Sequence, residues 1–133
     1  MAGRSIYRVT LVVRDYDEAL AFYVGKLGFE LLEDRPLEPG EGGKRWVLVA
    51  PPGGAGCALL LARAAGEAQA ARAGDQTGGR VAFFLETDDF ARDHVALLAR
   101  GVRFREEPRT EPYGTVAVFE DLYGNLWDLI EPA

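Results

Sequence analysis

Cysteine, histidine and methionine are almost absent from this sequence of 133 residues. The chain has one cysteine, Cys57, one histidine, His94, and one methionine. A single cysteine excludes an intrachain disulfide and a cysteine-cluster metal site, and it favours a reducing compartment. Long apolar runs are missing as well: no window approaches the ~18 apolar residues of a membrane span, and the N-terminus lacks the apolar stretch of a secretory leader. We therefore expect a cytoplasmic protein that does not insert into a membrane.

Basic charge is also scarce. The 15 basic residues are outnumbered by 21 acidic ones, which gives a net charge of −6. Such a charge disfavours binding to nucleic acid or to an anionic membrane. All the basic residues except Lys26 and Lys44 are arginine, the side chain that holds carboxylates and phosphates in a fixed fork. The positions of the arginines therefore bear directly on function.

The hydrophobic pattern runs twice along the chain, each time in the order β-α-β-β-β. In the first half it predicts strands over 6–13, 29–33, 44–49 and 57–62, with a helix from a cap at Asp15 to Gly28. In the second half it predicts strands over 80–86, 102–107, 115–119 and 125–130, with a helix over 90–100 that ends at Gly101. We interpret this as an internal duplication in one α+β domain covering 1–133: module one at about 5–63, a linker at 64–78 and module two at about 79–131.

One helix for four strands leaves one face of each sheet uncovered. We expect these faces to form a cupped, mixed β-sheet with the helices outside. In the opening strands, alternation places Val9, Leu11 and Val13 on the helix side and the other parity in the cup. The candidate cup residues on these two strands are Arg8, Thr10, Arg80 and Phe84. Arg8 and Arg80 lie at equivalent points of the repeat, which would make the cup basic in an acidic protein.

Several segments resemble the vicinal oxygen chelate superfamily of glyoxalases, extradiol dioxygenases and bleomycin resistance proteins. They are Val9-Thr-Leu-Val-Val-Arg-Asp15, Ala21-Phe-Tyr23, Lys26-Leu-Gly-Phe29 and Glu120-Asp-Leu-Tyr-Gly-Asn125. The likeness runs from about residue 6 to residue 131. It implies the duplicated fold and modules that pair across a homodimer, but the fold hosts many reactions and does not by itself name one.

The resemblance also implies four cup positions that hold a divalent metal in catalytic members. The matching positions here are Arg8 and Arg80 on the first strands, and a residue near Leu60 and Asp128 on the last strands. Only Asp128 can bind a metal, because a protonated guanidinium offers no lone pair. We therefore expect no metal and no cofactor. Asp128 would instead pair with both arginines, or join them in holding a small carboxylate or phosphate.

Two aromatic residues are further candidates for ligand contacts. Trp46 is expected to face the cup with Leu48, either as a wall for a ligand or as core. Tyr113, in a turn near the cup mouth, offers a hydroxyl to a ligand or is an ordinary surface residue. The remaining distinctive side chains have structural interpretations: Trp127 and Cys57 as core, and His94 as a half-buried helix residue.

Three classes of function remain open. The first is a metal-independent protein that binds a small molecule, with no nucleic-acid or membrane partner and with a homodimeric assembly. The second is an enzyme of lyase, isomerase or dioxygenase type. The third is a structural module whose cup is closed by salt bridges.

Overall fold

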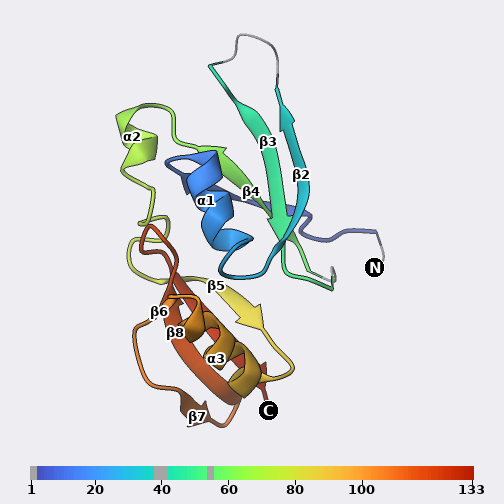
Figure 1. Ribbon diagram of the computed structural model, residues 1–133, viewed down its shortest axis with the longest axis vertical. Coiled ribbons are helices and arrows are strands. Elements are labelled where there is room, and N and C mark those ends of the chain that lie inside the picture. Colours follow the sequence, from blue (N-terminus) through green and yellow to red (C-terminus); the bar gives the residue numbers. More distant parts are fainter. Residues whose placement is uncertain (1–2, 38–41, 54–55) are drawn as a thin grey trace. The chain divides into compact units, whose positions relative to one another are not determined.

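The computed structural model describes residues 3–37, 42–53 and 56–133. It divides into two compact units, unit 1 up to Ala71 and unit 2 from Arg72. The elements are β1 (Arg8–Val13), α1 (Tyr16–Tyr23), β2 (Glu30–Pro36), β3 (Arg45–Ala50), β4 (Ala58–Arg63) and α2 (Gly66–Ala70) in unit 1, and β5 (Val81–Glu86), α3 (Phe90–Ala99), β6 (Arg103–Phe104), β7 (Arg109–Glu111), β8 (Gly114–Glu120) and β9 (Leu126–Pro132) in unit 2 (Figure 1).

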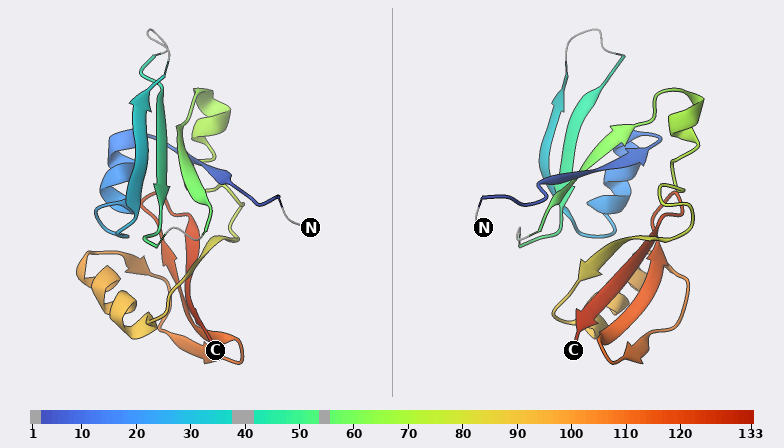
Figure 2. Two further views of the ribbon diagram at one scale, coloured as in Figure 1. Left: turned by 90° about the vertical axis from the view of Figure 1, so that its right-hand side faces the viewer. Right: turned by 180° about the vertical axis from the view of Figure 1, so that it is seen from behind.

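Unit 1 is a four-stranded mixed sheet in the order β1-β4-β3-β2. β1 and β4 are parallel, and the other pairs are antiparallel. Helix α1 packs against β3 and β4 on one side of the sheet (Figure 2). The core of this unit lies there and contains Leu11, Val13, Val47, Val49, Leu61 and, from α1, Ala19 and Tyr23, all fully buried. The predicted helix-side parity of the first strand is confirmed at Leu11 and Val13.

The predicted start of α1 is confirmed, but its end lies earlier than expected. The carboxylate of Asp15 accepts a hydrogen bond from the Glu18 amide at 2.8 Å, as an N-cap does. The helix ends at Tyr23 rather than near Leu27. The amides of Lys26 and Leu27 both return to the Phe22 carbonyl, so the chain leaves the helix in a tight turn. Gly28 follows with φ +76°, a conformation that favours glycine.

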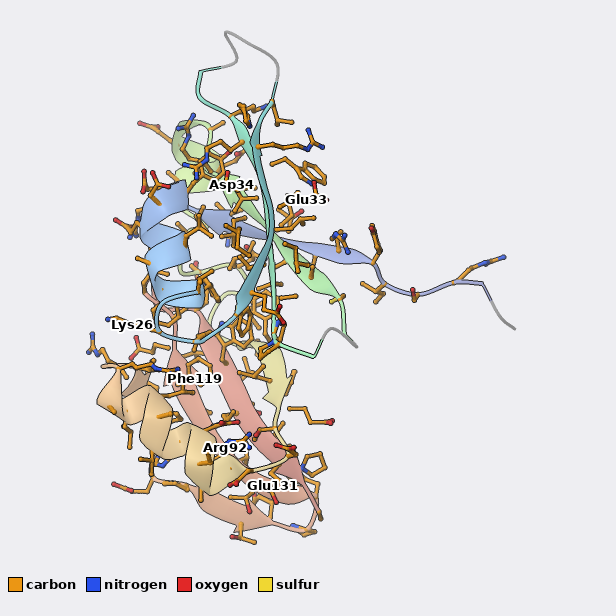
Figure 3. The ribbon with its side chains drawn as sticks, turned by 45° about the vertical axis from the view of Figure 1, so that its right-hand side comes forward. Lys26, Glu33, Asp34, Arg92, Phe119 and Glu131 are labelled. Carbon is orange, nitrogen blue, oxygen red and sulfur yellow. The ribbon has the colours of Figure 1, made fainter. Side chains whose placement is uncertain are left out.

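Unit 2 repeats this plan with the order β5-β9-β8-β6, and β7 also pairs with β8. β5 and β9 are parallel, as β1 and β4 are in unit 1. Helix α3 is capped by Asp89, whose carboxylate accepts from the Arg92 amide at 3.0 Å. Its first amide, that of Phe90, donates to the Glu131 carboxylate of β9 at 2.7 Å (Figure 3). Aromatic rings fill the space between α3 and the sheet, among them Trp127, Phe119 and Phe104.

The prediction of a single strand over 102–107 is wrong. Two short strands, β6 and β7, pair with β8 instead. The break falls where Pro108 has no amide to donate. There the carboxylate of Glu106 accepts a hydrogen bond from the Val118 amide at 3.0 Å and takes the place of a backbone partner.

Candidate functional site

In unit 1, three candidate residues share the sheet face opposite α1, which we call the far face of unit 1. Thr10 is the register partner of Leu60, and Leu60 is the partner of Leu48. Trp46 precedes Leu48 by two residues, and Arg8 precedes Thr10 by two. Because partners in register share a face and side chains alternate along a strand, Arg8, Thr10 and Trp46 lie on one side of this sheet, as the sequence predicted.

In the part of the chain that the structure describes, several arginines pair with carboxylates, but Arg8 does not. Arg45 binds Asp34 at 2.7 Å and Asp17 at 2.9 Å on the α1 side of the sheet. Within the described residues, no carboxylate lies at ion-pair distance from Arg8. One of its Nη atoms donates to the Tyr7 carbonyl at 3.0 Å, and its guanidinium lies 3.4 Å from the centroid of the Tyr7 ring. Its Nε is buried without a hydrogen-bond partner.

A cavity of about 310 Å³ opens beside Arg8. Its walls include the charged Arg8 and Glu30, the apolar Ile6, Leu32 and Pro51, and the small Ala50 and Ala58. Cys57 and Tyr7 also line it. The cavity therefore combines a cation, an anion and an apolar wall within one unit. Of its lining residues, only Arg8 is predicted from the sequence as a ligand contact.

In unit 2, Phe84 and Asp128 lie side by side on the face opposite α3, the far face of unit 2. They are register partners on β5 and β9, and Asp128 is also the partner of Val118 on β8. Phe84 is 67% exposed. The Oδ1 atom of Asp128 is buried and has no hydrogen-bond partner among the described residues. Burial raises the pKa of the Asp128 carboxyl, and the nearby charge of Glu106 raises it further, against the lowering effect of Arg109.

Arg109, which sequence reasoning missed, is the centre of the polar groups on this face. It binds the Glu106 carboxylate at 3.2 Å and that of Glu111 at 2.9 Å, and it donates to the Tyr113 hydroxyl at 3.1 Å. Arg109 is the register partner of Val116, which shares a face with Val118. The alternation of Arg109 and Glu111 before the turn at Tyr113 was the signal that could have revealed this cluster.

Arg80 lies apart from this cluster. Its side chain is exposed and precedes β5, which begins at Val81. Asp128 pairs in register with Phe84, four residues further along, so that Arg80 is ~13 Å away along the strand direction. Within unit 2, the structure brings Asp128 close to Arg109 rather than to Arg80.

The sequence matches the Glyoxalase/Bleomycin resistance protein/Dioxygenase superfamily over residues 5–129. The chain belongs to this superfamily. A curated relative from Shewanella frigidimarina, an uncharacterized protein, is 55% identical over 96% of this chain and 93% of its own length. Among solved structures, UcmS2 is 31% identical with a TM-score of 0.81, and each chain is covered to 98%. TnmS3 from Streptomyces sp. CB03234, described as an antibiotic binding protein, is 33% identical with a TM-score of 0.76 and covers 100% of this chain and 99% of its own.

The metal site that the superfamily resemblance implies does not fit the residues of this chain. Two of the four matching positions are Arg8 and Arg80, and a third falls near Leu60, which leaves Asp128 as the only donor. In the described part of the chain, no three His, Cys, Asp or Glu side chains gather so as to hold a metal ion. We therefore derive no chemistry through a metal.

Other expectations for this superfamily member can be compared directly with the structure. Trp127 is 3% exposed and is core, as predicted. His94 is half-buried between the rings of Phe90 and Phe104, also as predicted. The expectation that Cys57 is core is wrong: its side chain is exposed, because it precedes β4 and lies at the cavity. No helix among the described residues is long and apolar enough to cross a membrane.

Proposed function

We propose that this member of the superfamily binds a small organic molecule carrying a carboxylate or phosphate, without a metal, and that Arg8 holds the anionic group. One observation carries the proposal: Arg8 lines a cavity, and no carboxylate of the described residues lies at ion-pair distance from its guanidinium. A carboxylate or phosphate bound in the cavity would supply the missing anion in a charge-assisted hydrogen bond.

The size and walls of the cavity support a small ligand. Its volume of about 310 Å³ lies at the lower end of the range for small-molecule sites, roughly 300–1,000 Å³. The apolar side chains of Ile6, Leu32 and Pro51 would cover the rest of the ligand. The description of TnmS3 as an antibiotic binding protein supports small-molecule binding in this branch of the superfamily.

The other candidate residues have secondary roles in this proposal. Thr10 and Trp46 extend the far face of unit 1 beyond Arg8. Phe84, Asp128 and Tyr113 offer a ring, a carboxyl and a hydroxyl on the far face of unit 2. Arg80 is the second anion contact expected from the duplication, although its exposure makes it the weaker of the two. Metal independence is supported by the unsuitable donor set, and a cytoplasmic location by the single cysteine.

Thermal unfolding with added anions tests this proposal. Benzoate and inorganic phosphate should raise the melting temperature of the wild-type protein, and Arg8→Met should abolish the increase. Arg103→Met removes the same charge from an exposed position on β6 and should keep it. Arg80→Met shows whether both arginines take part. If Arg8→Met responds to both anions as the wild type does, the anion site is not at Arg8.

A second candidate function, proton transfer by an enzyme of lyase or isomerase type, rests on Asp128. A carboxyl whose pKa is raised by burial is typical of acid–base groups in active sites, and this one lies beside the exposed ring of Phe84. The test is exchange of carbon-bound hydrogen in pyruvate dissolved in D₂O, followed by NMR. Exchange that is lost in Asp128→Asn would favour an enzyme, and equal rates with and without protein would contradict it for this probe.

A further inference from the structure

Arg8 and Glu30 stand at the two ends of one row of residues across the sheet of unit 1. Arg8 is the register partner of Ala58, and Glu30 is the partner of Ala50. The pairing of β3 with β4, continued one residue past Val49 and Leu59, brings Ala50 beside Ala58. The row is therefore Arg8, Ala58, Ala50, Glu30, and all four residues line the cavity.

The spacing of this row explains why the two charges are not paired with each other. Three strand-to-strand steps of about 4.8 Å separate the backbones of Arg8 and Glu30 by ~14 Å. The two residues between them are alanines, 2% and 5% exposed, which form a low floor. Within the described residues, neither Arg8 nor Glu30 has an ion-pair partner. A cation and an anion thus face the same cavity across a small apolar floor.

One side wall of the cavity also depends on an irregularity of β2. The register of β2 with β3 shifts between Leu31 and Glu33, so that Leu32 is the additional residue of a β-bulge. Leu32 is 49% exposed and lines the cavity. At this bulge, an apolar side chain lines the same cavity as Glu30. Leu32 therefore forms an apolar wall near the Glu30 end of the cavity.

We propose that the ligand is a zwitterion that lies across the alanine floor, with its carboxylate at Arg8 and an ammonium group at Glu30. This inference rests on the proposed anion site and adds a second, opposite charge to the ligand. It also accounts for an arginine cavity in a superfamily member of net charge −6, because the ligand need not be an anion overall.

Binding of matched aromatic probes tests this inference. The probes are 4-(aminomethyl)benzoate, which carries both charges, 4-methylbenzoate, which carries only the carboxylate, and 4-methylbenzylamine, which carries only the ammonium group. We expect the zwitterion to bind wild-type protein about fivefold more tightly than 4-methylbenzoate, the upper end for an exposed ion pair. The isomer 2-(aminomethyl)benzoate, whose charges are adjacent, should show no such advantage. Affinities are measured by NMR titration of backbone amides.

Two substitutions assign the effect to Glu30. Glu30→Gln should abolish the difference in affinity between 4-(aminomethyl)benzoate and 4-methylbenzoate. Glu33→Gln changes the same charge on the same strand, at a residue that lies outside the cavity lining and pairs with Arg35 (Figure 3), and should preserve the difference. Thermal unfolding of both variants checks that they are folded.

The outcomes separate this inference from the proposed function. If the wild type binds 4-methylbenzoate in an Arg8-dependent way but gains nothing from the ammonium group, the anion site stands and the zwitterion is overturned. The same holds if the gain persists in Glu30→Gln. If 4-methylbenzoate binds wild type and Arg8→Met equally, or no probe binds at millimolar concentration, the proposed function itself fails, and the zwitterion with it.

Discussion

Phe84 and Asp128 are register partners on the parallel strands β5 and β9, so that an exposed ring lies beside a carboxyl with a buried, unpaired oxygen. The positive charge of Arg109 lowers the pKa of this carboxyl, and the negative charge of Glu106 raises it. Both come from β7 and the segment before it. The acidity of Asp128 therefore depends on a part of the chain that is far from β5 and β9 in sequence.

Asp128→Asn should stabilise the protein at pH 7, by ~0.5 kcal/mol because the residue is only partly buried. Burial raises the pKa of Asp128 in the folded state above its ordinary value of 3.8. Above that value the folded state therefore binds more protons than the unfolded state, and stability falls as pH rises through this window. The gain in Asp128→Asn should vanish at pH values below 3.8, where the carboxyl is protonated in both the folded and the unfolded state. Urea unfolding at both pH values measures it.

The exposed Glu107 provides the control for this measurement. Glu107→Gln removes the same charge from the same unit at an exposed position, and should leave the difference in stability between the two pH values close to that of the wild type. If Asp128→Asn is destabilising at pH 7, the fold favours the charged form of Asp128, and burial does not raise the pKa of this carboxyl.

Two substitutions should move the pKa of Asp128 in opposite directions. Arg109→Gln removes the charge that lowers this pKa, so the pKa should rise. Glu106→Gln removes a charge that raises it, so the pKa should fall; the glutamine oxygen can still accept from the Val118 amide. The measurement is an NMR titration of the Asp128 carboxyl carbon. Shifts of the same sign in both variants would show that altered burial, and not charge, dominates.

Local signals in the sequence predicted most of the fold. The caps at Asp15 and Asp89 act through their own backbone neighbourhood, so residue type was enough to locate them. The early end of the strand predicted over 102–107, which stops at Phe104, was missed because the side chain of Glu106 bonds an amide twelve residues away in place of a backbone partner. The hydrophobic periodicity of the sequence does not predict such a contact.

The sequence predicted which candidate site residues share a face of one strand. It did not predict which residues of different strands lie side by side. Alternation placed Arg8 and Thr10 together, because both lie on β1. Glu30 was missed because its position opposite Arg8 depends on the register of four strands and on a bulge at Leu32. Arg109 was missed for a similar reason: its neighbour Asp128 lies on another strand and is brought close by pairing through β8.

The protein is predicted to be a homodimer, as the superfamily resemblance implies. Light scattering at micromolar concentration should give twice the chain mass of 14.5 kDa. A mass of one chain at that concentration would contradict this prediction. In that case each ligand site would consist of residues from a single chain.

Gly74→Ala should destabilise unit 2 by about 2 kcal/mol or more, through backbone strain and steric overlap together. Gly74 has φ +84°, and a Cβ at this position would overlap the backbone carbonyl of Tyr123. Gly78→Ala is the matched control, because φ is +68° there and a Cβ would meet nothing within 4 Å. It carries only the cost of the left-handed conformation, roughly 1 kcal/mol. Urea unfolding of both variants measures the difference. Equal losses would mean that the segment at Gly74 does not pack against the turn at Tyr123 in solution.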